Sequence, residues 1–312
     1  MHFLSIMRGT FNIFCKYPVI VVPLLVCCVL YASLTVYLFN FDFEQVSISL
    51  QSILCLAFGI IFAYCALFSY GAFMMLEMIE QIETGHKPNL LKAFTDTLCK
   101  NFLKALPIII VWAIIMFVVS VIEALIDLIR DKNKRENSPS SDLSPRGIAF
   151  TLVGERQNFS YVRLFFDLVK SGIRMIVFYI YPAIAWENET PLNAVKKGLS
   201  GIRNHASQFF KSFASIELIA FFIFIPPIAM ITCAERFNVD YSNFAWQLLV
   251  IYVVSAFTYY LYLQQMCAAI LYLWNMKWEK EAEQAVREGR PVPSLSDIPE
   301  PDLLDDIPDL LL

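Results

Sequence analysis

Six long apolar stretches constrain what this chain can fold into more than any other feature. They run roughly over residues 17–40, 50–80, 106–129, 162–186, 212–234 and 245–275. A membrane-spanning helix needs about 20 apolar residues, and only helices or closed barrels satisfy their own backbone in lipid. The chain has 312 residues, of which 58% are hydrophobic, more than in an ordinary soluble domain. The sequence therefore predicts an all-α, polytopic membrane protein with six transmembrane helices within residues 1–280.

The fourth stretch is the weakest of the six. Its uncharged part, residues 175–186, is short, and three charged residues precede it: Asp167, Lys170 and Arg174. Spacings of three and four place these charges on one helix face, and long basic side chains can reach the headgroups from within a span. We expect this stretch to cross the membrane. If the polar loop at about 130–161 shares a side with the termini, the stretch is a re-entrant hairpin instead.

Basic residues indicate the orientation of the chain. Fourteen Lys and Arg residues lie in the amino-terminal segment, the connections after spans two and four and the segment after span six, which share one side in a six-span chain, against eight on the other side. The positive-inside rule then predicts that both termini are cytoplasmic. The loop at about 130–161 opposes this prediction, because it is short and itself rich in Lys and Arg.

Two connections share one construction: a polar turn with a proline, then a short amphipathic helix, then the next span. These helices are predicted at about 89–105 and 191–207, and in each an apolar stripe opposes a basic one. We expect both to lie in the headgroup layer, where anionic lipid attracts basic side chains; a merely solvated connecting helix is the alternative. The lipid-headgroup candidates are Lys92, Lys100, Lys104, Lys196, Lys197 and Arg203.

The start of the second amphipathic helix carries several signals. Thr190 is expected to cap it with its side chain, and Pro191 fits its first position. Glu187 and Glu189 favour the positive end of its dipole.

The segment 281–312 differs in composition from the rest. It is acidic, contains several prolines, and holds two imperfect copies of D-I-P followed by D-L-L, at 296–304 and 305–312. The sequence predicts a disordered cytoplasmic tail. Its paired leucines could dock into a soluble partner, or the segment is a solubilising tail.

Polar residues within the spans are candidates for a site, because charge in hydrocarbon is costly unless it is paired or lines a wet cavity. Glu123 and Asp127 lie on the same predicted side as Lys170 and Arg174, so ion pairs between spans three and four are expected. Glu217 in span five has no partner evident from the sequence. The intramembrane polar candidates are Glu123, Asp127, Asp167, Lys170, Arg174, Gln264 and Gln265.

Other span residues allow two interpretations. Gln264 and Gln265 are expected either to bond a neighbouring helix or to line a polar pathway. The pair Pro226-Pro227 and Pro107 mark either plain kinks or the interrupted helices of transporters.

Motifs for catalysis, metal or nucleic acid are missing from the sequence. The three histidines are isolated, the eight cysteines fall in or beside apolar runs, and no hydrolase, metalloprotease or phosphate-loop signature occurs. We therefore expect no enzyme, no catalytic residue, no metal and no cofactor, with membrane lipids rather than nucleic acid as partners.

Four stretches combine apolar spans, prolines and basic helices in one pattern. They are KYPVIVVPLLV (16–26), YGAFMMLEMIEQIETGHKPNLLKAF (70–94), YIYPAIAWENETPLNAVKKGLSGIRN (179–204) and AAILYLW (268–274). The pattern is similar to that of uncharacterised bacterial six-span inner-membrane proteins that share a domain of unknown function. More distantly, it resembles YciC-like proteins and the membrane domain of glycerophosphodiester phosphodiesterases. The resemblance implies this architecture and an inner-membrane location, but no catalytic residue; Lys197-Gly198 and the insert after Ile129 depart from it.

Three functions remain open at this point. The first is a non-catalytic inner-membrane protein that organises or senses lipid through its basic amphipathic helices, in envelope homeostasis. The second is a small-solute or lipid transporter or channel, which a continuous polar cavity reaching the middle of the membrane would favour. The third is a membrane adaptor that recruits a partner through the acidic tail.

Overall fold

The computed structural model describes residues 2–39, 50–130, 161–237, 239, 241–299 and 301. Every regular element in these residues is helical. The main helices are α1 (His2–Lys16), α2 (Val22–Phe39), α3 (Leu50–Glu83), α4 (Leu90–Asp96), α5 (Leu103–Arg130), α7 (Tyr161–Ala185), α8 (Pro191–Asn204), α9 (Ala206–Arg236) and α10 (Asn243–Arg287). Short 3-10 turns at Pro18–Val21 and Leu295–Asp297 and a π-helical turn at Thr97–Phe102 complete the described elements.

Six helical segments in the described residues are long and apolar enough to cross a membrane. They are Pro18–Tyr37, Leu54–Ile82, Leu90–Ile126, Leu164–Ala185, Ala206–Ala234 and Asn243–Arg287. The prediction of an all-α, polytopic membrane protein is therefore confirmed. Most of the polar loop predicted at 130–161 lies outside the described residues, so its side of the membrane stays a prediction.

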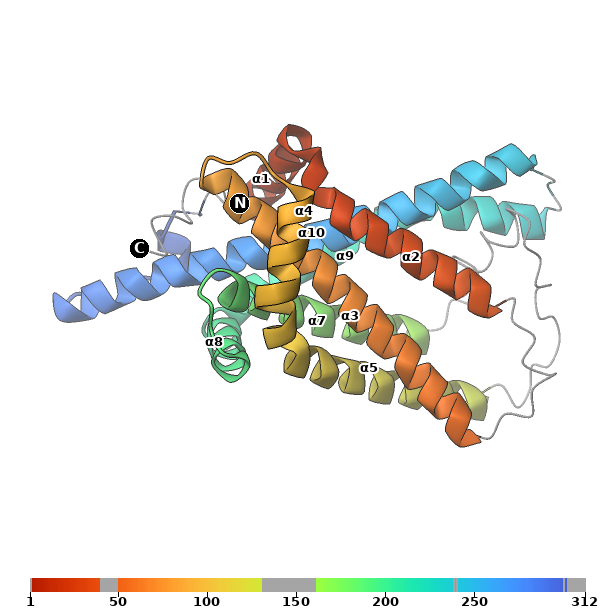
Figure 1. Cartoon of the computed structure of the whole chain (residues 1–312), viewed down its shortest axis with the longest axis horizontal. Coiled ribbons are helices and arrows are strands. Elements are labelled where there is room, and N and C mark those ends of the chain that lie inside the picture. The colour runs from red at the N-terminus through yellow and green to blue at the C-terminus, as the bar shows by residue number, and fades with distance from the viewer. Residues whose placement is uncertain are drawn as a thin grey trace.

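The spanning helices run lengthwise, while α4 and α8 run across the same end of the bundle (Figure 1). The α7 helix packs against α3, α5, α8 and α10. In the most apolar part of α7, 61% of the residues are buried, against 22–39% in the other five spans. Neighbouring helices shield α7 from lipid. This helix can therefore carry the charged residues that made it the weakest of the six predicted spans.

We expected the first amphipathic segment, at 89–105, to be a separate helix, and it is not. The chain stays helical from α4 through the π-helical turn into α5 and changes direction there (Figure 1). A π-helical turn is a common place for a helix to bend. Asn89 caps the start of α4, accepting hydrogen bonds from the amides of Leu91 and Lys92. Ala93 and Thr97 are buried on the inner face, whereas Leu91 and Lys92 are exposed.

The second amphipathic helix, α8, ends at Asn204 rather than at residue 207. Pro191 is its first residue, as predicted, but the side chain of Thr190 makes no capping hydrogen bond, so that prediction is wrong. Glu187 instead pairs with Lys197 and accepts a hydrogen bond from Tyr272 on α10. These contacts fix the start of α8 to the bundle.

The inner face of α8 is made of small residues. Ala194, Gly198 and Gly201 are buried on this face. A Cβ atom on Gly201 would lie 2.5 Å from Tyr179 Oη and 3.1 Å from Asn275 Cγ. The close approach of α8 to α7 and α10 therefore requires glycine at position 201.

Two consecutive prolines lie inside α9 without breaking it. The ring of Pro227 removes an amide donor and frees the carbonyl of Ile223, four residues earlier. Tyr252 Oη on α10 donates to that carbonyl at 2.8 Å. In a membrane, a freed carbonyl needs such a partner. Pro226 and Pro227, like Pro107 in α5, thus lie in continuous helices. This agrees with the interpretation that these prolines mark plain kinks and not interrupted helices.

The carboxy-terminal segment is not disordered over the part that the structure describes, which corrects the prediction for residues 281–299. The α10 helix continues to Arg287, and the chain then folds back so that Leu295 and Ile298 are buried. Trp278 Nε1 donates to the carbonyl of Pro293 at 2.8 Å, and Trp274 Nε1 donates to that of Ile298 at 3.2 Å. The burial of Leu295 and Ile298 and the hydrogen bonds from the two tryptophans thus hold the segment with the first D-I-P copy against α10. The second copy, at 305–312, lies outside the described residues.

Two further contacts hold this docked segment. Ser294 and Asp297 form a capping box, and the hydrogen bonds from Ser294 hold the pKa of the Asp297 carboxyl below its usual value. His205, between α8 and α9, lies edge-on to Trp278 with ring centroids 4.5 Å apart, and burial lowers the pKa of this histidine. Trp278, which bonds the docked segment, therefore also contacts the corner between α8 and α9.

Replacing Gly201 by Ala is expected to destabilise the protein by about 1–3 kcal/mol, because the added methyl group overpacks a closed interface. The matched control is Gly59→Ala in α3, where a Cβ meets nothing within 4 Å. Thermal unfolding of the purified proteins in detergent measures both. An unfolding midpoint of Gly201→Ala equal to that of Gly59→Ala would contradict the packing role of Gly201.

Candidate ligand-binding cavity within the helix bundle

A cavity of about 450 Å³ lies between α2, α3, α5, α7, α9 and α10. Exposure decreases with depth along α7: Leu164 and Asp167 are exposed, whereas Arg174 is buried. The apolar part of the lining is Tyr31, Ile60, Ile61, Met116, Leu164, Leu168, Ala220, Phe221, Phe224, Ile228 and Phe257. The polar part is Tyr64, Ser120, Asp167, Lys170, Ser171, Arg174, Glu217 and Tyr260. The cavity therefore combines apolar walls with charged and hydroxyl groups.

Arg174 is the most deeply buried charge of the cavity, and it lies about halfway along α7. Its Nε donates to Gln264 Oε1 at 2.6 Å, and Nη1 donates to Tyr64 Oη at 2.8 Å. Nη2 donates to Tyr260 Oη at 3.0 Å and to Ser171 Oγ at 3.4 Å. Four acceptors from three helices thus replace water around this guanidinium, as a buried charge requires.

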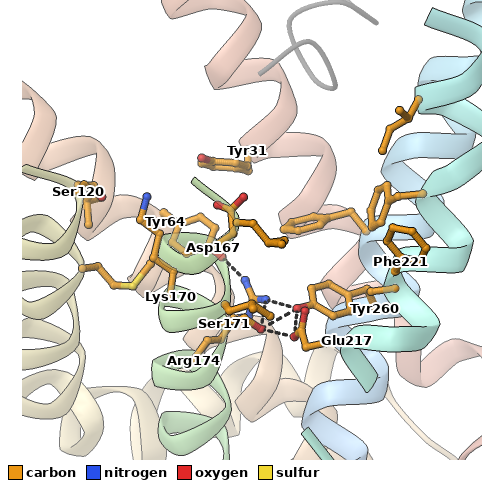
Figure 2. A pocket seen from close by; sticks show the side chains of 18 of the residues that line it. Tyr31, Tyr64, Ser120, Asp167, Lys170, Ser171, Arg174, Glu217, Phe221 and Tyr260 are labelled. Atoms are coloured by element: carbon orange, nitrogen blue, oxygen red, sulfur yellow. Dashed lines mark hydrogen bonds between the residues drawn. The ribbon is translucent and has the colours of Figure 1, made fainter. Parts of the chain in front are cut away.

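Glu217 on α9 is the counter-charge of this cluster. Its Oε1 accepts hydrogen bonds from Ser171 Oγ at 2.5 Å, Tyr260 Oη at 2.5 Å and Gln264 Nε2 at 3.2 Å. Each of these three side chains accepts from Arg174 and donates to Glu217. Figure 2 draws two of them, Ser171 and Tyr260, beside Arg174 and Glu217. Neutral side chains therefore connect a positive and a negative charge across α7, α9 and α10, and low polarity around them strengthens each bond.

A second charged contact lies on the same wall. Lys170 of α7 forms an ion pair with Glu123 of α5, which confirms the predicted pairing of spans three and four. Asp167, Lys170 and Arg174 all line the cavity, so the predicted single helix face is also confirmed. Asp127 lies in α5, but its side chain is outside the part that the structure describes.

The two glutamines of α10 have different surroundings. Gln264 joins the Arg174 cluster and bonds α7 and α9, so it both links helices and stands next to the cavity. Gln265 is fully buried, and neither its amide nitrogen nor its amide oxygen has a hydrogen-bond partner among the described residues. The prediction that Gln265 bonds a neighbouring helix is therefore wrong for the described part of the chain, and Gln265 is not among the residues that line this cavity.

The sequence prediction missed several members of the cluster. Glu217, for which no partner was evident from the sequence, accepts hydrogen bonds from three donors. Tyr64 and Ser171 were not singled out. One signal was present: Tyr260 and Gln264 are four residues apart, so they share a helix face. The partners across helices depend on how α7, α9 and α10 are placed relative to one another in the bundle.

The lipid-headgroup candidates lie on α4, the π-helical turn, α5 and α8, and none of them lines this cavity. Lys92, Lys196 and Arg203 are exposed. Lys100 is exposed as well, and its Nζ lies 3.3 Å from Asp96 Oδ1. Lys197 is paired with Glu187, and Lys104 donates to Asn188. Five of the six basic candidates are thus exposed and Lys197 is half-buried, while Lys100, Lys104 and Lys197 each have a partner in the protein.

The chemistry of the cavity suits binding. Within the described ranges, no group of three or more His, Cys, Asp or Glu could hold a metal ion. The strongest polar groups of the floor bond one another, which keeps them in fixed positions. Together, fold and cavity define a multi-pass, all-helical membrane protein with a polar network at the floor of a cavity between its spans.

Comparison with protein-family models, curated proteins and solved structures finds no match to this chain. The resemblance to bacterial six-span inner-membrane proteins therefore stays a prediction.

Replacing Arg174 by Met is expected to destabilise the protein by about 3 kcal/mol, because Glu217 then lacks its counter-charge. The double variant Arg174→Met with Glu217→Met should recover more than half of this loss, since apolar replacement of a whole buried pair is often neutral. Arg287→Met, at an exposed position on α10, is the control. Thermal unfolding in detergent tests the coupling: additive losses in the double variant would show that the two charges are independent.

Proposed function

We propose that this chain is a non-catalytic transporter of the bacterial inner membrane, with both termini in the cytoplasm, that binds a small amphipathic solute or lipid in its central cavity. The observation that carries this proposal is the cavity that descends between the spans to the Arg174–Glu217 cluster. The cluster lies about halfway along α7. A polar floor at this depth is costly in lipid and is typical of a substrate pathway.

The make-up of the cavity supports an amphipathic ligand. A volume of about 450 Å³ falls within the usual range of small-molecule pockets, which are mostly apolar with a few fixed polar groups. Isoleucine and phenylalanine side chains form the walls here, and charged groups lie on α7 and α9. An apolar body would therefore contact the walls while a polar head reaches the floor.

Replacing Ala220 by Phe is expected to fill the cavity and lower ligand occupancy at least about tenfold. Ala220 is buried and lines the cavity, whereas Leu218, two residues earlier on α9, is exposed and does not line it. Leu218→Phe is therefore the matched control. Native mass spectrometry of both proteins, released from nanodiscs made with native lipid extract, measures the small molecules that remain bound. Equal retention by the two variants would remove the support for the proposal.

The basic amphipathic helices support a second function, which is the organisation or sensing of anionic lipid. Leu91 and Leu199 are exposed beside exposed basic residues, so both helices present apolar and cationic side chains to their surroundings. Such a surface is typical of helices that lie in the headgroup layer. Envelope homeostasis is the process that this activity would serve.

Changing Lys92, Lys100, Lys196 and Arg203 together to Gln is expected to reduce the enrichment of anionic lipid around the protein, because each basic group near a membrane surface contributes about 1 kcal/mol. Lys104 and Lys197 are left unchanged, since they bond the connection between α7 and α8 through Asn188 and Glu187. Nanodiscs with equal phosphatidylglycerol and phosphatidylcholine allow the retained lipids to be counted by mass spectrometry. The control replaces Arg287 and Arg290, and an unchanged lipid ratio in the fourfold variant would exclude this function.

A third function, the recruitment of a soluble partner through the acidic tail, has less support. Ile298 of the first D-I-P copy and Leu295 just before it are buried against the protein itself. This segment would have to leave its buried position and its hydrogen bonds to Trp274 and Trp278 before a partner could bind it.

A further inference from the structure

We infer that the cavity takes an amphipathic amine, with a protonated ammonium head on an apolar body, and that Glu217 receives the head. This inference rests on the proposed function, because it names the ligand class of the same cavity. It follows from which polar atoms the cluster leaves open, which charges it already uses, and where the aromatic rings lie.

The two carboxylate oxygens of Glu217 have different surroundings. Oε1 accepts all three hydrogen bonds from Ser171, Tyr260 and Gln264. Oε2 accepts none from the described residues. Glu217 also lines the cavity, so Oε2 is an acceptor available to a ligand. An ionised carboxylate oxygen binds a hydrogen-bond donor, and most strongly a charged one.

The basic groups of the lining are already engaged. Lys170 is paired with Glu123, and Arg174 donates to four acceptors. An anionic head would therefore have to displace one of these contacts, and it would approach the carboxylates of Asp167 and Glu217. Like charges enclosed in one cavity of low polarity repel each other. The cavity therefore disfavours ligands with a carboxylate or phosphate head.

Aromatic rings stand on the same side of the cavity as Glu217. Phe221 and Phe224 follow it by one and two helical turns on α9, and Tyr260 and Phe257 line the cavity from α10. Figure 2 shows Glu217, Phe221 and Tyr260 together on this side. The face of an aromatic ring attracts an ammonium group, which adds to the attraction of the carboxylate.

Arg174 has a positioning role in this arrangement. It fixes Ser171, Tyr260 and Gln264, and these three donors hold Oε1 of Glu217. The other oxygen of the same carboxylate is thereby kept in a constant place for the head of the ligand.

The test uses the full chain in nanodiscs and three probes with the same ten-carbon body: decylamine, decan-1-ol and decanoate at neutral pH. We expect decylamine to bind at least about tenfold more tightly than decan-1-ol, and decanoate to bind most weakly. Equilibrium dialysis gives the affinities, and Ala220→Phe identifies the part of each signal that comes from the cavity.

Glu217→Gln is expected to abolish the preference for decylamine, whereas Glu281→Gln, at an exposed position on α10, leaves it unchanged. Glu217→Asp retains a carboxylate and should keep the order of the three probes with weaker binding. If Glu217→Gln does not fold, the order of the probes on the unchanged chain decides the question alone.

The outcomes separate the two proposals. If no probe shows binding that Ala220→Phe removes, the proposed function fails, and the inference fails with it. If the cavity binds probes but decanoate or decan-1-ol binds as tightly as decylamine, the cavity stands and the ligand class is overturned. Preference for decylamine that persists in Glu217→Gln would overturn the role of Glu217.

Discussion

The compensation of one buried positive charge is the interaction on which the rest of this structure depends. The guanidinium of Arg174 lies among six packed spans, where an unpaired charge would cost several kcal/mol. Side chains from α3, α7 and α10 contact it directly, and Glu217 of α9 balances it through shared partners. A cluster with members on four helices fixes how those helices stand relative to one another. It also explains why α7, the most polar span, lies inside the bundle.

Most of the fold could be predicted, because membrane insertion leaves few choices. Length and hydrophobicity located all six spans, and spacing located the face of α7 that carries Asp167, Lys170 and Arg174. Helix boundaries were less certain. The join between α4 and α5 depends on a π-helical turn that no sequence signal marks, and the end of α8 differs by a few residues. The tail was misjudged because its composition resembles a disordered segment, while Leu295 and Ile298 find a surface beside Trp274.

The site was predictable only in part, for a physical reason. Charge within an apolar stretch identifies a costly group, so Arg174 and Lys170 could be found without a structure. The partner of such a group is decided by contacts between distant helices, and Glu217 lies 43 residues from Arg174 in sequence. Its pairing passes through Ser171, Tyr260 and Gln264, which are common side chains with no distinctive spacing to α9. Gln265 shows the opposite case, a conspicuous polar residue to which packing gives no hydrogen-bond partner among the described residues.

The length of α10 has a mechanical consequence. This helix has 45 residues, which corresponds to roughly 67 Å at the usual rise per residue. Tyr260 and Gln264 contact the cavity cluster from its middle, while Trp274 and Trp278 hold the docked segment beyond the bundle. One continuous helix therefore carries both sets of contacts. The position of the docked segment relative to the cavity is set by α10 itself and not by a flexible connection.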